Sequence, residues 1–207
     1  MKLNTNSNTY TIIYSAVLVV IVAFLLAFVY QALKPMQDKN VELDTKIHKL
    51  NALNVRGLNK SDVDKTYDSL SVAQATKKNV TFEVFEVDGE QKYLVPVKGQ
   101  GLWGPIWGYI SIDKDKNTIF GADFQHESET AGLGALITET KFQNEFKGKK
   151  ICAEGSEEVA ITVAKKGKST AAEENTVDAI TGATLTSNGV NDMVNAGLKD
   201  WREAVKR

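Results

Sequence analysis

Residues 178–190 read DAITGATLTSNGV and combine small side chains with closely spaced hydroxyls at the start of a helical pattern. The first turn of a helix has unpaired N–H groups and a partial positive charge, so it favours binding of a phosphate. Gly182 and Ala183 leave room for an approaching group. A second interpretation needs no ligand, because a hydroxyl just before a helix is also an ordinary N-cap. The candidates for that cap are Thr184, Thr186 and Ser187.

Two other segments place glycines beside apolar side chains. Residues 99–104 read GQGLWG, and residues 129–134 read ETAGLG. From residue type alone, Trp103 and Trp107 are expected to be core aromatics, and the glycines are expected to be turn residues. The residue types by themselves therefore assign no ligand to these two segments.

The composition excludes several classes of site. The 207 residues carry 25 Lys and Arg against 26 Asp and Glu, which argues against a nucleic-acid binder driven by positive charge. The single cysteine, Cys152, excludes an intramolecular disulfide and a cysteine-ligated zinc or iron–sulfur site. The two histidines, His48 and His126, exclude a three-histidine metal site. No nucleotide-binding loop of the G-x-G-x-x-G type is expected.

The strongest local signal is an apolar segment near the N-terminus. Residues 11–33 contain no charged residue and as a helix would be roughly 35 Å long, enough to cross a bilayer core of about 30 Å. A cleaved signal peptide is the alternative, but the run is too long and no clear cleavage site follows. Residues 1–10 are predicted to be an N-terminal tail before the span. Four lysines follow the span against one before it, which by the charge rule places the rest of the chain inside the cell.

The rest of the chain divides into a stalk, residues 34–60, and one domain, residues 61–207. Within the stalk, helical spacing of Leu43, Ile47 and Leu50 predicts a short amphipathic helix. The domain is predicted to open with a helix from residue 61 to about residue 74, because Ser61 and Asp64 resemble a capping box.

Alternating apolar residues follow and predict antiparallel strands, with a hairpin turn at residues 88–89 and a later strand at residues 159–163. A final helix is predicted at residues 187–206, and its apolar stripe is Met193, Val194, Leu198, Trp201 and Val205. Strands and helices do not alternate as βαβ units. The predicted fold class is therefore α+β, with a mixed, mostly antiparallel sheet domain after a single N-terminal transmembrane helix.

The hydroxyl-rich segment resembles the flavinylation motif D-x-x-(S/T)-G-A-(S/T)-x-x-(S/T), and every constrained position matches. In that family FMN is joined through its phosphate to the second hydroxyl residue, which corresponds to Thr184. Residues 99–104 and 129–134 are similar to the family's G-x-G-L-W and E-T-P-G-L-G segments, although Ala131 replaces the usual proline.

The resemblance implies that Trp103 and Leu133 lie against the flavin ring, that Thr130 lies near its polar edge, and that Lys166 is a basic residue near the flavin. Apolar side chains suit a flat ring, and glycines let backbone donors approach it. The implied FMN-binding residues are Asp178, Thr181, Gly182, Ala183, Thr184, Ser187, Trp103, Glu129, Thr130, Leu133 and Lys166.

Together with the apolar segment, these motifs make the chain resemble the C subunits of the Na⁺-translocating NADH:quinone reductase. The resemblance implies an electron-transfer subunit of a membrane-bound oxidoreductase, with covalent FMN as its cofactor and no complete activity alone. Its implied partners are the other subunits, a flavin transferase and the membrane, but no nucleic acid. NADH and any iron–sulfur centre then belong to other subunits. The implied location is the cytoplasmic membrane with the flavin domain on its outer face, which disagrees with the lysine count.

Two alternatives stay open. The G subunit of the Rnf electron-transport complex, which uses ferredoxin and NAD, shares the anchor, the fold and the flavin threonine. Residues 185–190, which read LTSNGV, look closer to the C subunits of the reductase. An anchored binding module without flavin is supported only by the N-cap interpretation of Thr184.

Overall fold

The computed structural model describes residues 7–78 and 80–206, and the chain divides into two compact units, with the division in the sequence between Asp44 and Thr45. Helix α1 (Asn8–Ala52) begins in the first unit and ends in the second. Its N-terminal part has a mean hydropathy of 3.0 over its most apolar window, and none of that window is buried. By length and composition α1 can therefore cross a membrane.

The helix differs from the expected division into a span and a separate stalk helix. It runs through Pro35 without ending and continues to Ala52. Its last turns, from Thr45, belong to the second unit, where Leu50 and Ala52 are buried. The compact domain thus includes residues that the sequence pattern assigns to the stalk.

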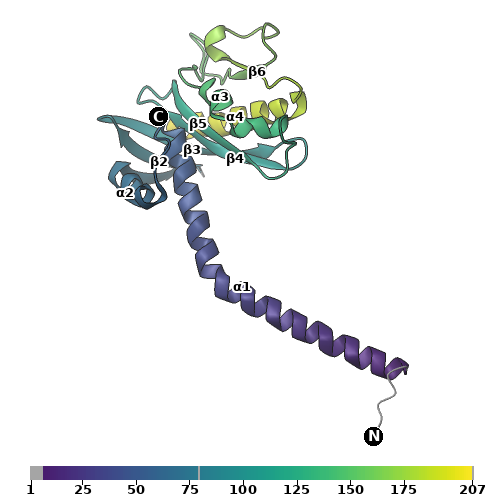
Figure 1. Ribbon diagram of the computed structural model, residues 1–207. Coiled ribbons are helices and arrows are strands. Elements are labelled where there is room, and N and C mark those ends of the chain that lie inside the picture. The colour runs from purple at the N-terminus through teal and green to yellow at the C-terminus, as the bar shows by residue number, and fades with distance from the viewer. Residues whose placement is uncertain (1–6, 79, 207) are drawn as a thin grey trace. The chain divides into compact units, whose positions relative to one another are not determined.

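The second unit is built around a five-stranded antiparallel sheet in which neighbouring strands follow one another along the chain (Figure 1). Its strands are β1 (Ser71–Lys77), β2 (Val80–Val87), β3 (Glu90–Gln100), β4 (Pro105–Ile112) and β5 (Ile119–His126). The predicted hairpin turn between β2 and β3 is confirmed, because Asp88 and Gly89 have φ angles of +54° and +74°. Two successive positive φ angles give the twist that a two-residue hairpin needs.

The helix that was predicted to extend to about residue 74 is shorter in the structure, because a strand begins before that residue. Helix α2 (Lys60–Leu70) ends four residues earlier than that, and β1 begins at Ser71. Most residues of β1 are exposed, because it is an edge strand that pairs only with β2. A strand without a buried face has no alternating apolar pattern, so no strand signal is visible in its residues.

One face of the sheet is covered by helix α4 (Thr184–Val205), which lies along β3. The predicted apolar stripe of this helix is buried from Met193 to Trp201, together with residues such as Phe82 and Val97 of the sheet. The approach is close: a side-chain carbon on Gly99 of β3 would overlap the Met193 side chain. The final helix and the mostly antiparallel α+β class are therefore confirmed.

Short elements connect β5 to α4. The chain forms η1 (Gly134–Thr138), α3 (Thr140–Asn144), β6 (Thr162–Ala164), η2 (Glu173–Asn175) and β7 (Thr176–Asp178). The strand predicted at residues 159–163 is shortened to β6, which pairs in parallel with β7. Val159 forms only an isolated bridge with Cys152.

The opposite face of the sheet packs against α2 and the last turns of α1. Ala52 and Leu53 join Phe85, Val87 and Leu94 in a second apolar cluster. Polar contacts tie the end of α1 to the strands, since Lys49 Nζ forms an ion pair with Glu83 Oε1 at 2.6 Å and His48 Nδ1 lies 2.9 Å from Asp123 Oδ1.

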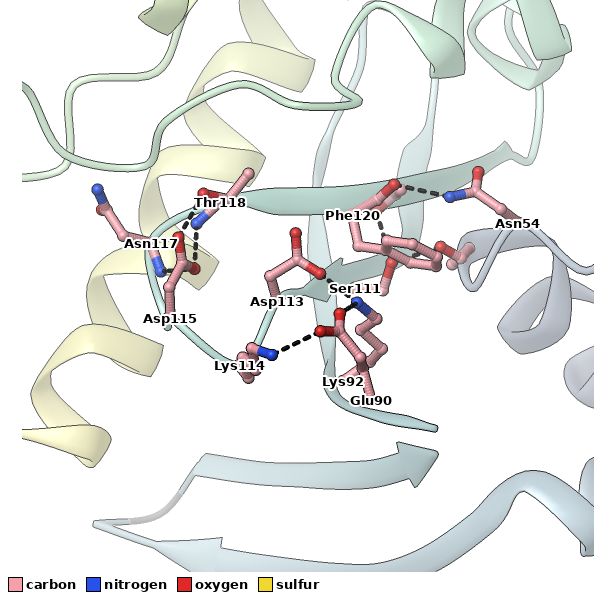
Figure 2. A network of polar contacts seen from close by, with 12 residues as sticks. Asn54, Glu90, Lys92, Ser111, Asp113, Lys114, Asp115, Asn117, Thr118 and Phe120 are labelled. Carbon is pink, nitrogen blue, oxygen red and sulfur yellow. Dashed lines mark hydrogen bonds and ion pairs between the residues drawn. The ribbon is translucent and has the colours of Figure 1, made fainter. Parts of the chain in front are cut away.

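Beyond this cluster, polar side chains join the ends of three strands (Figure 2). The Lys92 ammonium is buried and donates to Asp113 at 2.6 Å and to Glu90 at 3.0 Å. It also lies 4.4 Å from the centroid of the Phe120 ring. Burial opposes the charge on Lys92, but the two carboxylates outweigh burial and raise its pKa. The buried lysine is therefore a satisfied structural cation.

Candidate functional site

Thr184 is the first residue of the 22-residue helix α4, and its side chain is exposed. The N-cap is Ala183, and no side chain caps this helix end. Among the residues that the structure describes, none forms a hydrogen bond with the Thr184 hydroxyl. The N-cap interpretation of Thr184 is therefore wrong. The hydroxyl instead faces solvent beside the unpaired amides of the first helical turn.

The hydroxyls of the motif have different environments. Thr186 is buried and donates to Glu129 Oε2 at 2.6 Å. Ser187 is buried as well, and its Oγ accepts the Ile180 amide at 3.1 Å, which closes the turn before the helix. Thr181 is exposed. Exposure thus leaves Thr181 and Thr184 accessible, and the motif resemblance distinguishes Thr184.

The turn before α4 depends on a glycine. Gly182 has a φ of +82°, a conformation that L-amino acids with a side chain rarely adopt. A side-chain carbon built on Gly182 would lie 3.1 Å from Leu133 Cδ2, so this turn touches the segment of residues 129–134. Two of the three segments that the sequence singles out therefore meet here.

The third segment meets them through the helix. A side-chain carbon on Gly189 of α4 would overlap the carbonyl oxygen of Gln100, so only glycine fits here without a shift. We call residues 101–104 the tryptophan loop. Residues 99–104 match the spacing G-x-G-x-x-G, although no nucleotide-binding loop of that type was predicted. They lead from β3 into β4 rather than into a helix, so they are not a dinucleotide-binding loop.

Apolar side chains are exposed on all three segments. Trp103 is 66% exposed, Leu133 41% and Leu185 60%, and Leu102 is also exposed. The expectation that Trp103 is a core aromatic is therefore wrong, and Trp107 is also partly exposed. Exposed apolar side chains that gather beside a free hydroxyl are typical of a binding surface.

Glu129 connects two of these segments. Its side chain is 7% exposed, and its Oε1 accepts the Trp103 amide at 2.9 Å while Oε2 accepts the Thr186 hydroxyl. Burial alone would raise the pKa of this carboxyl. The hydrogen bonds from Thr186 and from the amides of the tryptophan loop outweigh burial and lower its pKa, so Glu129 is ionised at neutral pH.

Two hollows flank the turn before α4. One, of about 130 Å³, is lined by Thr184, Thr181 and Gly182 with residues 163–165. The other, of about 560 Å³, is lined by Thr181, Asp178 and Lys166 among others. Lys166 is largely exposed, and its Nζ lies 3.6 Å from Asp178 Oδ2. This pair therefore belongs to the second hollow, and Thr181 borders both.

The remaining predicted residue, Thr130, is exposed at the turn after β5. Its carbonyl accepts the amides of Leu133 and Ala135, each at 3.1 Å, which holds the turn. Ala131, at the position where proline is usual, is exposed in the same turn, and Gly132 supplies its positive φ of +74°.

Sequence reasoning missed Leu102 and Leu185 as exposed apolar residues of these segments, and it missed Thr186 and Gly189 as residues that position the start of α4. One signal could have found the buried hydroxyls. The buried stripe of α4, extended back from Val190 by three and four residues, reaches Ser187 and Thr186 and leaves Thr184 outside it.

The arrangement suits a phosphorylated ligand with a flat ring. The exposed Thr184 hydroxyl and the first helical amides suit a phosphate, and the apolar side chains suit a ring. No group of three or more His, Cys, Asp or Glu side chains that could hold a metal ion occurs in residues 7–78 and 80–206.

Comparison with known proteins agrees with this class of site. The model of the FMN-binding domain family matches residues 101–199, which include the tryptophan loop, residues 129–134 and the hydroxyl-rich segment. The fold and the site thus define an FMN-binding domain.

A crystal structure of the C subunit of the Na⁺-translocating NADH-quinone reductase from Parabacteroides distasonis is 36% identical, with a TM-score of 0.76. The match covers 84% of this chain and 98% of that one. The chain belongs to the family of C subunits of the Na⁺-translocating NADH-quinone reductase. This assignment favours the C subunits over the Rnf-type alternative.

The corresponding C subunit of Chlamydia muridarum is 36% identical over 153 residues, covering 67% of this chain and 45% of that protein. The chain therefore spans about half the length of the curated relatives that it matches. The crystal structure of Shewanella oneidensis NqrC, at 20% identity and a TM-score of 0.65, covers 77% of this chain and 95% of that one and agrees in fold.

Proposed function

We propose that this chain is an electron carrier that holds one FMN esterified through its phosphate to Thr184. The observation that carries the proposal is the exposed, unpartnered Thr184 hydroxyl at the N-terminus of a 22-residue helix, beside two buried and hydrogen-bonded hydroxyls. The bond joins the threonine oxygen to the flavin phosphate, and the helical amides beside it stabilise the phosphate charge. A flavin transferase supplies the FMN from a flavin nucleotide whose phosphate carries a leaving group: the bond from the threonine oxygen to phosphorus forms as the bond from phosphorus to that leaving group breaks, and the hydroxyl proton passes to a base of the transferase.

The exposed apolar side chains of Trp103, Leu133 and Leu185 are the surface that the flavin ring would cover. Gly182, Ala183 and Thr181 shape the turn next to the phosphate, and Thr130 and the Lys166–Asp178 pair offer polar groups at its edges. When bound, FMN supplies the ability to accept and release electrons, which none of the side chains here provides.

The chain acts as one relay in a membrane complex that oxidises NADH, reduces quinone and exports Na⁺. It has one helix that can cross a membrane within residues 7–78 and 80–206, and residues 11–33 of that helix contain no ionisable side chain other than tyrosine, so that helix by itself offers no ion path. Its single cysteine supplies no iron–sulfur centre. NADH, quinone and Na⁺ sites therefore belong to partner subunits.

The mass of the natural polypeptide tests the attachment. The full chain, produced together with its flavin transferase and stripped of loosely bound molecules with acid, should exceed its amino-acid mass by one esterified FMN. A mass equal to that of the bare polypeptide would remove the electron-carrier proposal. The chain produced without the transferase is the control, and it should keep the bare mass.

We further propose that α1 anchors the chain in the cytoplasmic membrane and that the flavin domain lies on the outer face. The positive charges near the span predict the orientation only weakly, because the four lysines are mixed with acidic residues. We therefore follow the location that the family implies, which is the outer face. The native Cys152 is 3% exposed, and burial raises the pKa of its thiol, so it gives little background in thiol labelling.

A single engineered thiol tests this location. Lys147→Cys lies at an exposed position outside the site, so an impermeant maleimide added to whole cells should label it. The unaltered chain, with only buried Cys152, is the matched control and should stay unlabelled. Labelling of Lys147→Cys only after the cells are broken would place the domain inside.

A further inference from the structure

The carboxylate of Glu129 collects donors from two elements that are distant in sequence. It accepts the Trp103 amide at 2.9 Å and the Thr186 hydroxyl at 2.6 Å. The backbone at Leu102 and Gly104 also helps to lower the pKa of this carboxyl. The two donors thus come from the tryptophan loop and from the first turns of α4.

Each oxygen of the Glu129 carboxylate already accepts a hydrogen bond from the protein, and the residue is only 7% exposed. A buried carboxylate with a protein donor on both oxygens favours a role inside the protein over direct contact with the cofactor. The sequence motif, in contrast, groups Glu129 with the cofactor-binding residues.

The surroundings of the carboxylate are closed by two glycines. A side-chain carbon on Gly101 would overlap Glu129 Oε1, and one on Gly134 would overlap Oε2 and crowd the Thr186 hydroxyl. The carboxylate is thus enclosed by the loop, the helix and the turn after β5. It fixes the tryptophan loop against the helix end that carries Thr184.

We infer that Glu129 is a positioning residue, which holds the tryptophan loop against the start of α4 and so sets where the Trp103 indole lies relative to Thr184. One consequence of this inference, the placement of Trp103 beside the flavin, rests on the proposed function. The tie between loop and helix is a property of the chain itself and can be measured without flavin.

The first test needs no flavin. In a Trp107→Phe background, Trp103 is the only exposed indole of the chain, because Trp201 is buried. Glu129→Gln keeps the shape of the side chain, but one carboxylate oxygen becomes an NH₂ group. That group cannot accept a hydrogen bond from the Trp103 amide or from the Thr186 hydroxyl. Loss of this buried, charged hydrogen-bond partner should raise the fraction of molecules in which the tryptophan loop is detached from α4 by roughly 5- to 150-fold.

The readout is the fluorescence anisotropy of Trp103, which should fall in Glu129→Gln and in Thr186→Val. Glu127→Gln, an exposed carboxylate two residues away, is the matched control and should keep the original anisotropy. Thermal unfolding followed by circular dichroism confirms that each variant is folded. Unchanged anisotropy in either folded tie variant, Glu129→Gln or Thr186→Val, would overturn the inference.

The second test uses the full chain carrying FMN. Glu129→Gln should keep the added mass of FMN but change the flavin fluorescence, because the Trp103 indole is no longer held beside the ring. In a Trp103→Ala background, the same substitution should have no further effect. An equal change in that background would show that Glu129 does not act through Trp103. A wild-type chain without FMN would instead refute the proposed function and leave the anisotropy test standing.

Discussion

Thr184→Ala should remove the FMN mass from the chain completely, because the substitution deletes the oxygen atom that forms the ester. The unpartnered hydroxyl of Thr184 contributes no hydrogen bond to the fold. Alanine also has a higher helix propensity than threonine, so the domain should change in stability by no more than about 0.5 kcal/mol. The measurement is the intact mass after production with the flavin transferase.

Two further variants make this prediction specific. Thr184→Ser restores a hydroxyl at the same backbone position and should restore the FMN mass. A peptide map of the unaltered chain should place the added mass on Thr184 rather than on Thr181, the other exposed hydroxyl of the motif. An FMN mass that persists in Thr184→Ala would exclude Thr184 as the attachment residue.

Trp201→Ala should cause the largest loss of stability, about 3–5 kcal/mol of unfolding free energy. The Trp201 side chain is 0% exposed and lies between α4 and the sheet. Its ring centroid is 4.9 Å from that of Phe82 in an edge-to-face arrangement and 5.1 Å from that of Tyr93. Alanine would leave a cavity beneath the helix that carries Thr184, and urea unfolding followed by circular dichroism measures the loss.

Trp103→Ala is the matched control, because it removes the same side chain from an exposed position. It should change the unfolding free energy by only about 0.5 kcal/mol or less. With FMN attached, however, it should change the flavin fluorescence, since the indole is proposed to lie against the ring. A loss of several kcal/mol in Trp103→Ala would mean that this tryptophan belongs to the core.

Much of the fold was predictable because its signals are local. The apolar segment of α1, the Asp88–Gly89 turn and the stripe of α4 each depend on neighbouring residues along the chain. Strand β1 was not predictable in this way. Its residues are exposed, and they form a strand only because β2 supplies hydrogen-bond partners along one edge.

The chemistry that the site offers can be read from residue types and their spacing. Residues 178–190 contain the hydroxyls, the small residues and the helix start that a phosphate ester requires, and residues 99–104 and 129–134 contain the glycines and apolar side chains. Each of these features lies within one short segment, so none of them requires knowledge of the other segments.

Packing, in contrast, settles which hydroxyl is free and which tryptophan is exposed. Successive residues of a helix point about 100° apart, so the packing of α4 on β3 turns Thr186 inward and leaves Thr184 in solvent. The carboxylate of Glu129 then joins the tryptophan loop to that helix across 57 positions of the sequence. A contact of this kind depends on the approach of two backbones at Gly189, which no local pattern encodes.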